Sequence, residues 1–253
     1  MLELYHWEPQ VDSGEVLICL REKQLPFRGH YVDLRELQQH QPEFRRLNPR
    51  GQVPVLLHDG RVLCEGGLIL LYLEEAFPAV PLSPADAAAR YAMLAWIKYV
   101  EERLAPAILL TGWYASPPPA PAWRDRARAS SAALPPERQR WWARLLDEEP
   151  PREALALARE SLGLGVRRLE QTLERSAWLA GETYSLADIA LCLAVRALAA
   201  LTPDLLNPDV AAHTLAWLGR LEQRAAVRDT LTMARVPHPE RDFMPGPEPV
   251  RWG

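Results

Sequence analysis

The order of apolar and polar residues over positions 1–77 alternates between strand-like and helix-like patterns. A short strand is predicted within residues 2–7 and a helix over residues 13–23, where a run of apolar residues lies between polar ends. Asp59-Gly60 separates two later apolar runs and is typical of a hairpin turn. Three further strands and one apolar helix are predicted over residues 27–32, 53–57, 61–64 and 66–77, with an irregular or helical polar segment after the second strand. This order predicts a mixed four-stranded sheet with helices on its faces, an α+β arrangement.

From Ala85 onward the apolar spacing is helical, and no convincing strand pattern follows. The sequence therefore predicts a first domain over residues 1–78, a linker rich in proline and alanine over residues 79–88, and an all-α domain over residues 89–236. Helical spacing is clearest over residues 85–113, 152–175, 186–201 and 214–223. An insertion rich in proline and tryptophan, over residues 115–151, interrupts this domain and is predicted as loop with one short helix. A proline-rich tail over residues 237–253 follows the domain and is predicted to be extended.

Composition excludes several classes of protein. The 253 residues carry 29 basic and 33 acidic side chains, a net charge of -4, which argues against a nucleic-acid partner. No apolar run approaches the roughly 20 residues of a membrane span, and the N-terminus lacks the basic and apolar regions of a signal peptide, so a cytoplasmic protein without a membrane partner is expected. Cys19, Cys64 and Cys192 are scattered and form no CxxC pair, so we expect neither a disulfide framework nor a metal site.

The segment Asn48-Pro49-Arg50-Gly51-Gln52-Val53-Pro54-Val55-Leu56 places a proline directly before an apolar strand. Proline lacks the N–H that an interior ladder position needs, so Pro54 belongs at the start or the edge of a strand. A trans bond is the ordinary state of such a proline, since only about 5–6% of X-Pro bonds are cis. A cis bond would instead turn the backbone of Val53 outward, where it could pair with an extended peptide ligand.

This segment, followed by the hairpin and by Cys64-Glu65-Gly66 at the start of a helix, resembles the glutathione-binding domain of cytosolic glutathione transferases. The opening Leu2-Glu3-Leu4-Tyr5 is similar as well, and the resemblance covers residues 2–77 better than the helical half. It implies a thioredoxin-like first domain, glutathione as co-substrate, and a homodimer. In that family the proline that corresponds to Pro54 is cis.

The resemblance also implies binding positions for glutathione. Val53 would pair with its cysteinyl backbone, while Glu65 and Gly66, at the N-terminus of a helix, would hold the γ-glutamyl carboxylate. Serine or threonine is usual at the position of Gly66, so the missing hydroxyl would weaken binding by roughly 1–2 kcal/mol. Gln52 and His40 would contact the glycyl end, although a histidine in a polar loop is as readily explained by solvation.

Ser13 is the candidate catalytic residue. A hydroxyl at a helix N-terminus, supported by the helix dipole, would lower the pKa of a bound thiol from about 8.5 and generate a nucleophilic thiolate. Serine-type transferases place their serine at the start of this helix. The alternatives are that Ser13 is only part of a helix cap with Asp12, or that Tyr5 or His6 activates the thiol.

The segment Ser185-Leu186-Ala187-Asp188 forms a predicted capping box at the start of a helix. Its role is expected to be structural. It is similar to the folding signature of the helical domain in glutathione transferases, so it supports the same family from the other half of the chain.

The second substrate is expected in the cleft between the domains. Trp7, Trp113 and Tyr114, with Trp123, are candidates to line this pocket. Core packing is the favoured explanation for any one of them, whereas the group as a whole indicates a hydrophobic, aromatic electrophile. The long turn between Tyr5 and Ser13 resembles bacterial transferases related to lignin β-aryl etherases. Two alternatives to a transferase remain open: a non-catalytic binding protein with the same fold, and a glutathione-dependent isomerase or dehalogenase.

Overall fold

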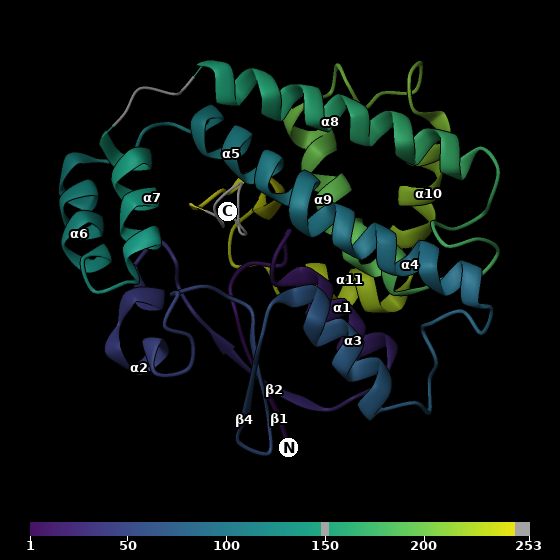
Figure 1. Cartoon of the computed structure of the whole chain (residues 1–253), viewed down its shortest axis with the longest axis horizontal. Helices are drawn as coiled ribbons and strands as arrows, with labels where there is room; N and C mark the ends of the chain where they lie inside the picture. Colours follow the sequence, from purple (N-terminus) through teal and green to yellow (C-terminus); the bar gives the residue numbers. More distant parts are fainter. Residues whose placement is uncertain (148–151, 246–253) are drawn as a thin grey trace.

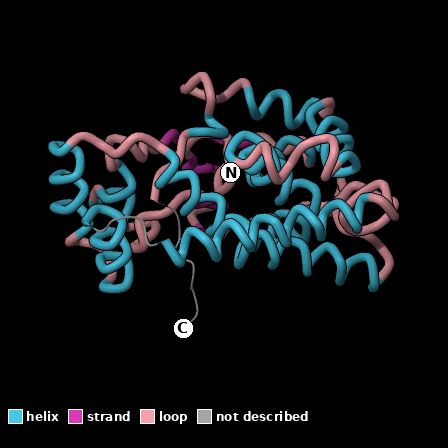
Figure 2. The backbone as a smooth tube through the Cα atoms, turned by 90° about the horizontal axis from the view of Figure 1, so that it is seen from above, coloured by secondary structure: helices cyan, strands magenta, loops and turns pink. Residues whose placement is uncertain are grey.

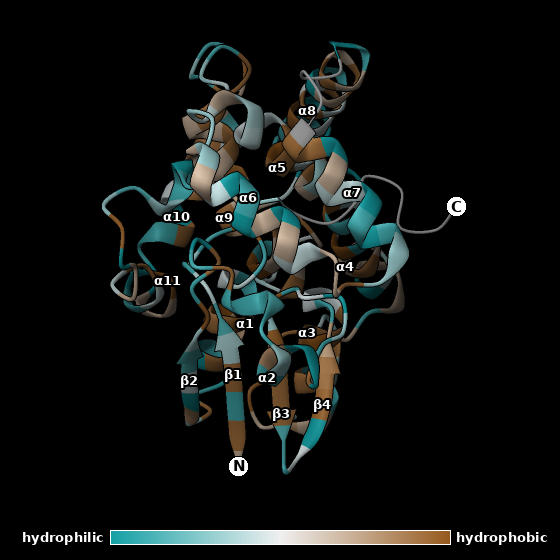
Figure 3. Ribbon diagram, turned by 90° about the vertical axis from the view of Figure 1, so that its left-hand side faces the viewer, coloured by the Kyte–Doolittle hydropathy of each residue, from teal (hydrophilic) through white to brown (hydrophobic). Residues whose placement is uncertain are grey.

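The computed structural model describes residues 1–147 and 152–245. A four-stranded sheet lies at the lower end of the molecule in Figures 1 and 3, and the helices of the second half of the chain lie above it. None of the helices in the described ranges combines the length and the apolar character that a membrane span requires.

The sheet has the strand order β2-β1-β3-β4 and is mixed, as the sequence predicts. Strand β1 (Leu2–His6) pairs in parallel with β2 (Phe27–Tyr31) and antiparallel with β3 (Val55–His58). Strand β4 (Arg61–Cys64) closes the edge through the predicted hairpin, with His58 opposite Arg61. Asp59 and Gly60 both have positive φ, 50° and 82°, which is why this dipeptide makes the tight turn.

Helices α1 (Gly14–Glu22) and α3 (Gly66–Ala76) pack against each other and share a core with the sheet. Strand alternation accounts for this packing, because Leu2 and Leu4 are buried in that core whereas Tyr5 belongs to the cluster on the other face. The polar segment after β2 contains a short 3-10 helix, η1 (Gln38–His40), and one turn of helix, α2 (Pro42–Arg45).

The second half of the described chain is helical, as predicted. After α3 the next helix, α4 (Ala87–Tyr99), passes through a five-residue π-helical stretch, η2 (Val100–Leu104), into α5 (Ala105–Ala115). The others are α6 (Pro121–Ser131), α7 (Pro136–Asp147), α8 (Arg152–Leu173), α9 (Leu186–Leu201), α10 (Ala212–Glu222), α11 (Ala225–Leu231) and the short 3-10 helix η3 (Pro239–Arg241).

The insertion differs from the sequence prediction of loop with one short helix, which is wrong. It forms two helices, α6 and α7, which lie together at the left-hand end of the molecule in Figures 1 and 2. Pro121 and Pro136 stand at the first position of these helices, where proline lacks only an N–H that would have no partner in the helix. The tail was predicted as extended, but its described part contains η3, and residues 246–253 lie outside the described residues.

The predicted capping box at the start of α9 is confirmed. The Ser185 N–H donates to Asp188 Oδ2 at 2.9 Å, and the Ala187 N–H donates to Ser185 Oγ at 3.3 Å. Asp188 is fully buried and also accepts hydrogen bonds from the Leu179 N–H and from the Trp217 indole N–H. This carboxylate therefore ties together three segments of the helical half.

The two halves of the chain are joined by packing and by charge. Helix α1 packs against α9 and α11, and its last residue, Glu22, receives two hydrogen bonds from the Arg224 guanidinium, at 2.6 and 2.9 Å. Within the first half, the buried Lys23 forms a salt bridge with Glu74 of α3 at 2.6 Å. These contacts fix the position of α1, whose N-terminal turn contributes to the candidate site.

Candidate functional site

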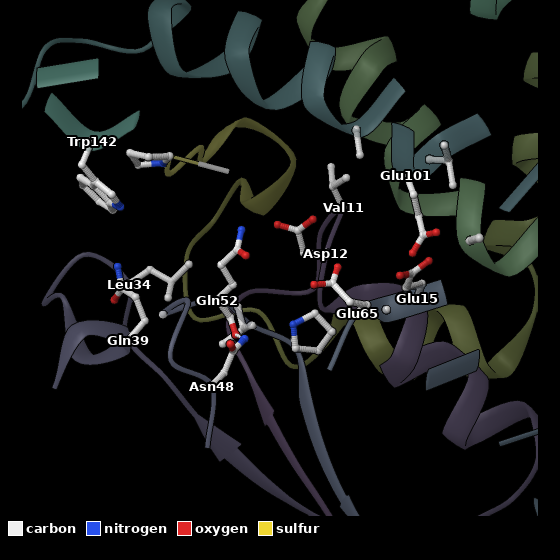
Figure 4. Close-up of a pocket in the computed structure, with 18 residues that line it drawn as sticks. Val11, Asp12, Glu15, Leu34, Gln39, Asn48, Gln52, Glu65, Glu101 and Trp142 are labelled. Carbon is white, nitrogen blue, oxygen red and sulfur yellow. Dashed lines mark hydrogen bonds between the residues drawn. The ribbon is translucent and has the colours of Figure 1, made fainter. Parts of the chain in front are cut away.

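One cleft gathers residues from the first turn of α1, the segment before β3, the N-terminus of α3, η2 and α7 (Figure 4). Of the predicted glutathione contacts, the structure brings five to its wall: Gln52, Val53, Pro54, Glu65 and Gly66. The described residues that line it also include four carboxylates, Asp12, Glu15, Glu65 and Glu101, and no lysine, arginine or histidine. The cleft is therefore acidic at the end formed by α1, α3 and η2.

Backbone geometry shapes the wall before β3. The Val53–Pro54 bond is cis, as the resemblance implies, and Val53 lies outside the strand pairing. The turn that leads to it is held by Asn48, which donates to the Gln52 carbonyl at 2.8 Å, and Gln52 Oε1 accepts from the Arg50 guanidinium at 3.1 Å. These bonds hold the backbone and side chain of Gln52 at the cleft.

The N-terminus of α3 is occupied by side chains of the protein itself. Glu65 precedes the helix with φ 69° and ψ 114°, a conformation that residues with a side chain rarely adopt and that is typical of ligand-binding positions. The Gly67 N–H donates to Glu101 Oε1 at 3.0 Å. A Cβ at Gly66 would collide with the carboxylate of Glu15, and a Cβ at Gly67 would lie 2.6 Å from Glu101 Oε1. The glycine pair thus leaves room for two carboxylates at this helix end.

Ser13 directly precedes α1, as expected, but its side chain is only 1% exposed and makes no cap hydrogen bond. Its Oγ accepts a hydrogen bond from the Trp7 N–H at 3.1 Å. Among the described residues of this turn, Val11, Asp12 and Glu15 line the cleft and Ser13 does not. The hydroxyl hydrogen remains available for donation, so its catalytic role stays a prediction.

The long turn between β1 and α1 is held by residues 235–245, the described end of the chain, which we call the C-terminal arm. Gln10 donates to the Asp242 carbonyl at 2.6 Å, and the fully buried Glu8 accepts from the Arg235 N–H at 2.9 Å and from the Tyr31 hydroxyl at 2.5 Å. Pro245, at the end of the described arm, lines the cleft. The arm therefore positions the residues that precede α1.

His40 faces the insertion and is not among the described residues that line the cleft. Its Nδ1 lies 2.8 Å from the Ser130 hydroxyl, and its ring meets that of Trp142 edge-on at 4.8 Å. Burial, assisted by the charges of Arg138 and Arg45, lowers the pKa of His40 to about 4. The ring is therefore neutral at pH 7 and offers no cation to a glycyl carboxylate.

None of the four aromatic residues predicted for the substrate pocket is among the described residues that line the cleft. Trp7 is buried in the core beneath the insertion, and Trp113 and Tyr114 are half-buried against the helical core. Trp113, Trp123 and Trp142 form a row with neighbouring ring centroids 6.2 and 6.3 Å apart. Of this row, Trp142 lines the cleft and is 1% exposed, whereas Trp113 and Trp123 are half-buried, so the row runs from the site toward the surface.

Sequence reasoning missed Asp12 as a wall residue, as well as Glu15, Glu101 and Trp142. Only the unusual Gly66-Gly67 pair signalled that side chains from elsewhere fill the end of α3. Within the described residues, no group of three or more histidine, cysteine or acidic side chains is arranged to hold a metal ion. The cleft can thus bind an elongated polar ligand between two helix N-termini.

Comparison with known proteins gives consistent matches over both halves. The family models described as the N-terminal and C-terminal domains of glutathione S-transferase match residues 13–76 and 127–225. Protein LigF of Sphingobium sp. (strain NBRC 103272 / SYK-6) is 34% identical over 245 residues, 90% of this chain and 92% of LigF. The crystal structure of the β-etherase LigF superimposes with a TM-score of 0.84, at 32% identity, over 92% of this chain and 99% of that chain.

A glutathione transferase from Burkholderia graminis, solved with two glutathione molecules per subunit, is also similar. Its TM-score is 0.68 and its identity 28%, over 92% of this chain and 88% of that one. Glutathione S-transferase GstA of Escherichia coli O157:H7 is 25% identical over 89% of this chain and 96% of GstA. The thioredoxin-like domain followed by an all-α domain is thus confirmed, and the chain belongs to the glutathione S-transferase family. As a member of this family, the protein is a glutathione transferase, and glutathione is its co-substrate.

Proposed function

We propose that this protein transfers glutathione to an aromatic β-aryl ether or a related hydrophobic electrophile. The observation that carries the proposal is one cleft that holds Val53 and Pro54 between the N-terminal turns of α1 and α3. Similarity to the β-etherase LigF over nine-tenths of the chain supports the choice of an ether substrate. The row of indole rings that reaches the cleft at Trp142 suits an aromatic group.

The reaction requires a thiolate and an aligned carbon atom. The N-terminus of α1 would favour the thiolate through its dipole, and Ser13 would donate its hydroxyl hydrogen to the sulfur. The sulfur attacks the carbon that bears the ether oxygen, so a C–S bond forms as the C–O bond breaks. The leaving aryl oxide takes up the proton released by the thiol. Holding both reactants in one cleft supplies the alignment.

Glutathione would lie across the cleft with its cysteinyl part at Val53 and Pro54 and its γ-glutamyl part at Glu65 and Gly66. Gln52, which Arg50 orients, would contact the glycyl end. His40 would act indirectly here, since its neutral ring supports Trp142 and Ser130. Trp7, Trp113 and Tyr114 would shape the hydrophobic part of the site from behind its wall.

A homodimer is part of the proposal. Large apolar side chains are exposed on neighbouring elements of the molecule: Val62 on β4, Leu68 on α3, and Tyr91 and Leu94 on α4. Tyr91 and Leu68 are 75% and 61% exposed. Four of the eight large apolar residues that are exposed in the described part of the chain lie on these elements, and such a surface suits a contact with a second copy. We also propose that the protein is cytoplasmic and that it has no metal, nucleic-acid or membrane partner.

A non-catalytic binding protein is the second candidate, because the Ser13 side chain is buried and two carboxylates occupy the N-terminus of α3. The test is turnover of an aryl ether with a chromogenic phenol as leaving group, in the presence and absence of glutathione. Glutathione-dependent release of the phenol and formation of the thioether support the transferase. Glutathione binding without reaction toward ethers, epoxides or aryl halides would favour the second candidate.

A further inference from the structure

Glu8 is a buried carboxylate that the reaction described above does not use. It lies in the turn between β1 and α1, and its side chain has no exposed surface. Its Oε1 accepts a hydrogen bond from the Tyr31 hydroxyl at 2.5 Å, and its Oε2 accepts one from the Arg235 N–H at 2.9 Å. Because a buried carboxylate is costly unless it is hydrogen-bonded, both donors are needed to keep Glu8 in this position.

These bonds join the turn to strand β2 and to the C-terminal arm. The Arg235 guanidinium lies over the Tyr31 ring, 3.8 Å from its centroid, so the two residues that donate to Glu8 also contact each other. A further bond joins the same turn to the arm, from Gln10 Nε2 to the Asp242 carbonyl at 2.6 Å. The partners from the arm are 227 and 232 residues away in the sequence, so the shape of the turn depends on a distant segment.

The arm is itself fixed against the body of the protein. Asp242 forms an ion pair with Arg35, with 2.6 Å between Arg35 Nη2 and Asp242 Oδ2. Phe243 is buried, and its ring lies so close to α5 that a Cβ at Gly112 would be 2.3 Å from it. The missing side chain at Gly112 therefore gives the arm the room to pack, and the arm can act as a rigid support for the turn.

Bonds within the turn transmit this support to the start of α1. The Gln10 N–H donates to the Glu8 carbonyl, and the Gly14 N–H donates to the Gln10 carbonyl, both at 2.8 Å. The segment between Gln10 and Gly14 contains Asp12, which lines the cleft, and Ser13, the proposed donor to the sulfur. The proposed contacts with glutathione come instead from the segment before β3 and from the start of α3. Activation and binding therefore depend on different parts of the chain.

We propose that Glu8 is a positioning residue for activation of the glutathione thiol. By joining the turn to Tyr31 and to the C-terminal arm, it sets where the N-terminus of α1 and the Ser13 hydroxyl stand relative to the sulfur. Loss of its two bonds impairs formation of the thiolate and leaves the binding of glutathione largely intact. This inference rests on the proposed function, because the thiolate is the nucleophile of that reaction.

Glu8→Gln tests the proposal on the full chain. A carboxylate offers one acceptor oxygen to each donor, whereas an amide has a single acceptor oxygen and turns its NH2 group toward the other donor. The midpoint of thiolate formation on bound glutathione, followed by ultraviolet absorbance against pH, should rise by about one pH unit, the effect of one lost hydrogen bond. Below that midpoint kcat should fall by about tenfold, while the dissociation constant of glutathione stays within about threefold of the wild-type value.

The direction of the shift separates positioning from charge. Since a nearby carboxylate disfavours a thiolate, removal of the Glu8 charge alone would lower the midpoint instead of raising it. Tyr31→Phe removes one of the two bonds and keeps the ring beneath Arg235, so its midpoint should rise by a smaller amount. If Glu8→Gln does not fold, the shift in Tyr31→Phe decides the question.

Glu22→Gln is the matched control, because Glu22 lies at the other end of α1 and accepts two hydrogen bonds from Arg224. Its midpoint should equal that of the wild type, even where urea unfolding shows a loss of stability. An unchanged or lowered midpoint in Glu8→Gln, or an equal rise in Glu22→Gln, would overturn the inference and leave the proposed function intact. If the wild type forms no thiolate with glutathione, both the inference and the proposed function fail.

Discussion

The carboxylate of Glu15 occupies the space that a side chain at Gly66 would need, so residues on α1 and α3 compete for one position. Position 66 therefore has no side chain with a hydroxyl, and the carboxylate of the buried Glu15 takes the space that such a side chain would need. At the N-terminus of α3, Glu101 accepts the hydrogen bond of the Gly67 N–H and Glu15 fills the space beside Gly66.

Gly66→Ala should weaken glutathione binding if the γ-glutamyl part lies at Glu65 and Gly66. Its Cβ would push the end of the flexible Glu15 side chain aside at the cleft wall, so the affinity for glutathione should fall, while the free energy of unfolding should change by no more than about 1 kcal/mol. Gly219→Ala is the control, because a Cβ there meets nothing within 4 Å. An unchanged dissociation constant for glutathione in Gly66→Ala, measured calorimetrically, would place the γ-glutamyl part elsewhere in the cleft.

Ser13→Ala should lower turnover and leave glutathione affinity largely unchanged, if the hydroxyl stabilises the thiolate. It also removes the acceptor of the Trp7 N–H, which costs about 1–3 kcal/mol in the free energy of unfolding because that N–H is buried. Steady-state kinetics and urea unfolding measure the two effects separately. Asp12→Asn, from the same turn but at the cleft wall, is the comparison. Full turnover in Ser13→Ala would remove Ser13 from the mechanism.

His40 should make folding sensitive to acid. Its pKa is about 4 in the folded chain and near 6.5 when unfolded, so the unfolded state binds more protons between these values. The stability contributed by the neutral ring is complete above pH 6.5 and is lost as pH falls toward 4, by at most about 3 kcal/mol. His40→Asn keeps a hydrogen-bonding group for Ser130 and should lose less stability over this range. Parallel pH curves for the two proteins would contradict the account.

Asp188→Ala should destabilise the helical half severely. The substitution leaves the buried N–H groups of Leu179, Ser185 and Trp217 without an acceptor, and a loss of about 3–5 kcal/mol is expected in denaturant unfolding. Asp86→Ala removes an exposed N-cap bond to the Ala89 N–H and should cost only about 1 kcal/mol. Similar losses at the two positions would argue against a special role for the buried network.

Leu68→Arg should shift the protein from dimer to monomer in sedimentation velocity. Leu68 is the most exposed apolar residue of α3, and a charge there would be buried in a contact between copies. Leu164→Arg, on α8, is the control for added charge, because Leu164 is also exposed and lies outside the proposed contact. A dimer that persists in Leu68→Arg would place the interface elsewhere.

The sequence was sufficient for the elements whose patterns are local. The hairpin at Asp59-Gly60 and the capping box at Ser185 depend on neighbouring residues only, and both occur as predicted. The insertion was predicted to contain one short helix and contains two, α6 and α7, because its prolines were interpreted as breaks, although the first helical position accepts proline. Local signals define where elements begin and end.

The site was predicted less completely, since its side chains come from distant parts of the chain. Gln52 and Val53 were found through the motif over residues 48–56, and Gly66 through the segment Cys64-Glu65-Gly66 at the start of a helix. Glu15 and Glu101 reach the same helix end from α1 and η2, and no spacing in the sequence reveals that meeting. His40 was expected to bind the ligand, but burial beneath the insertion directs its ring toward Ser130 and Trp142.

The central claim is that this cleft binds glutathione and activates its thiol. We would titrate the purified protein with glutathione and follow the ultraviolet absorbance of the thiolate as a function of pH. The account predicts a saturable thiolate signal with a midpoint well below the pKa of a free thiol, about 8.5. Saturable binding with no thiolate below that pH would contradict activation, and the absence of binding would contradict the claim as a whole.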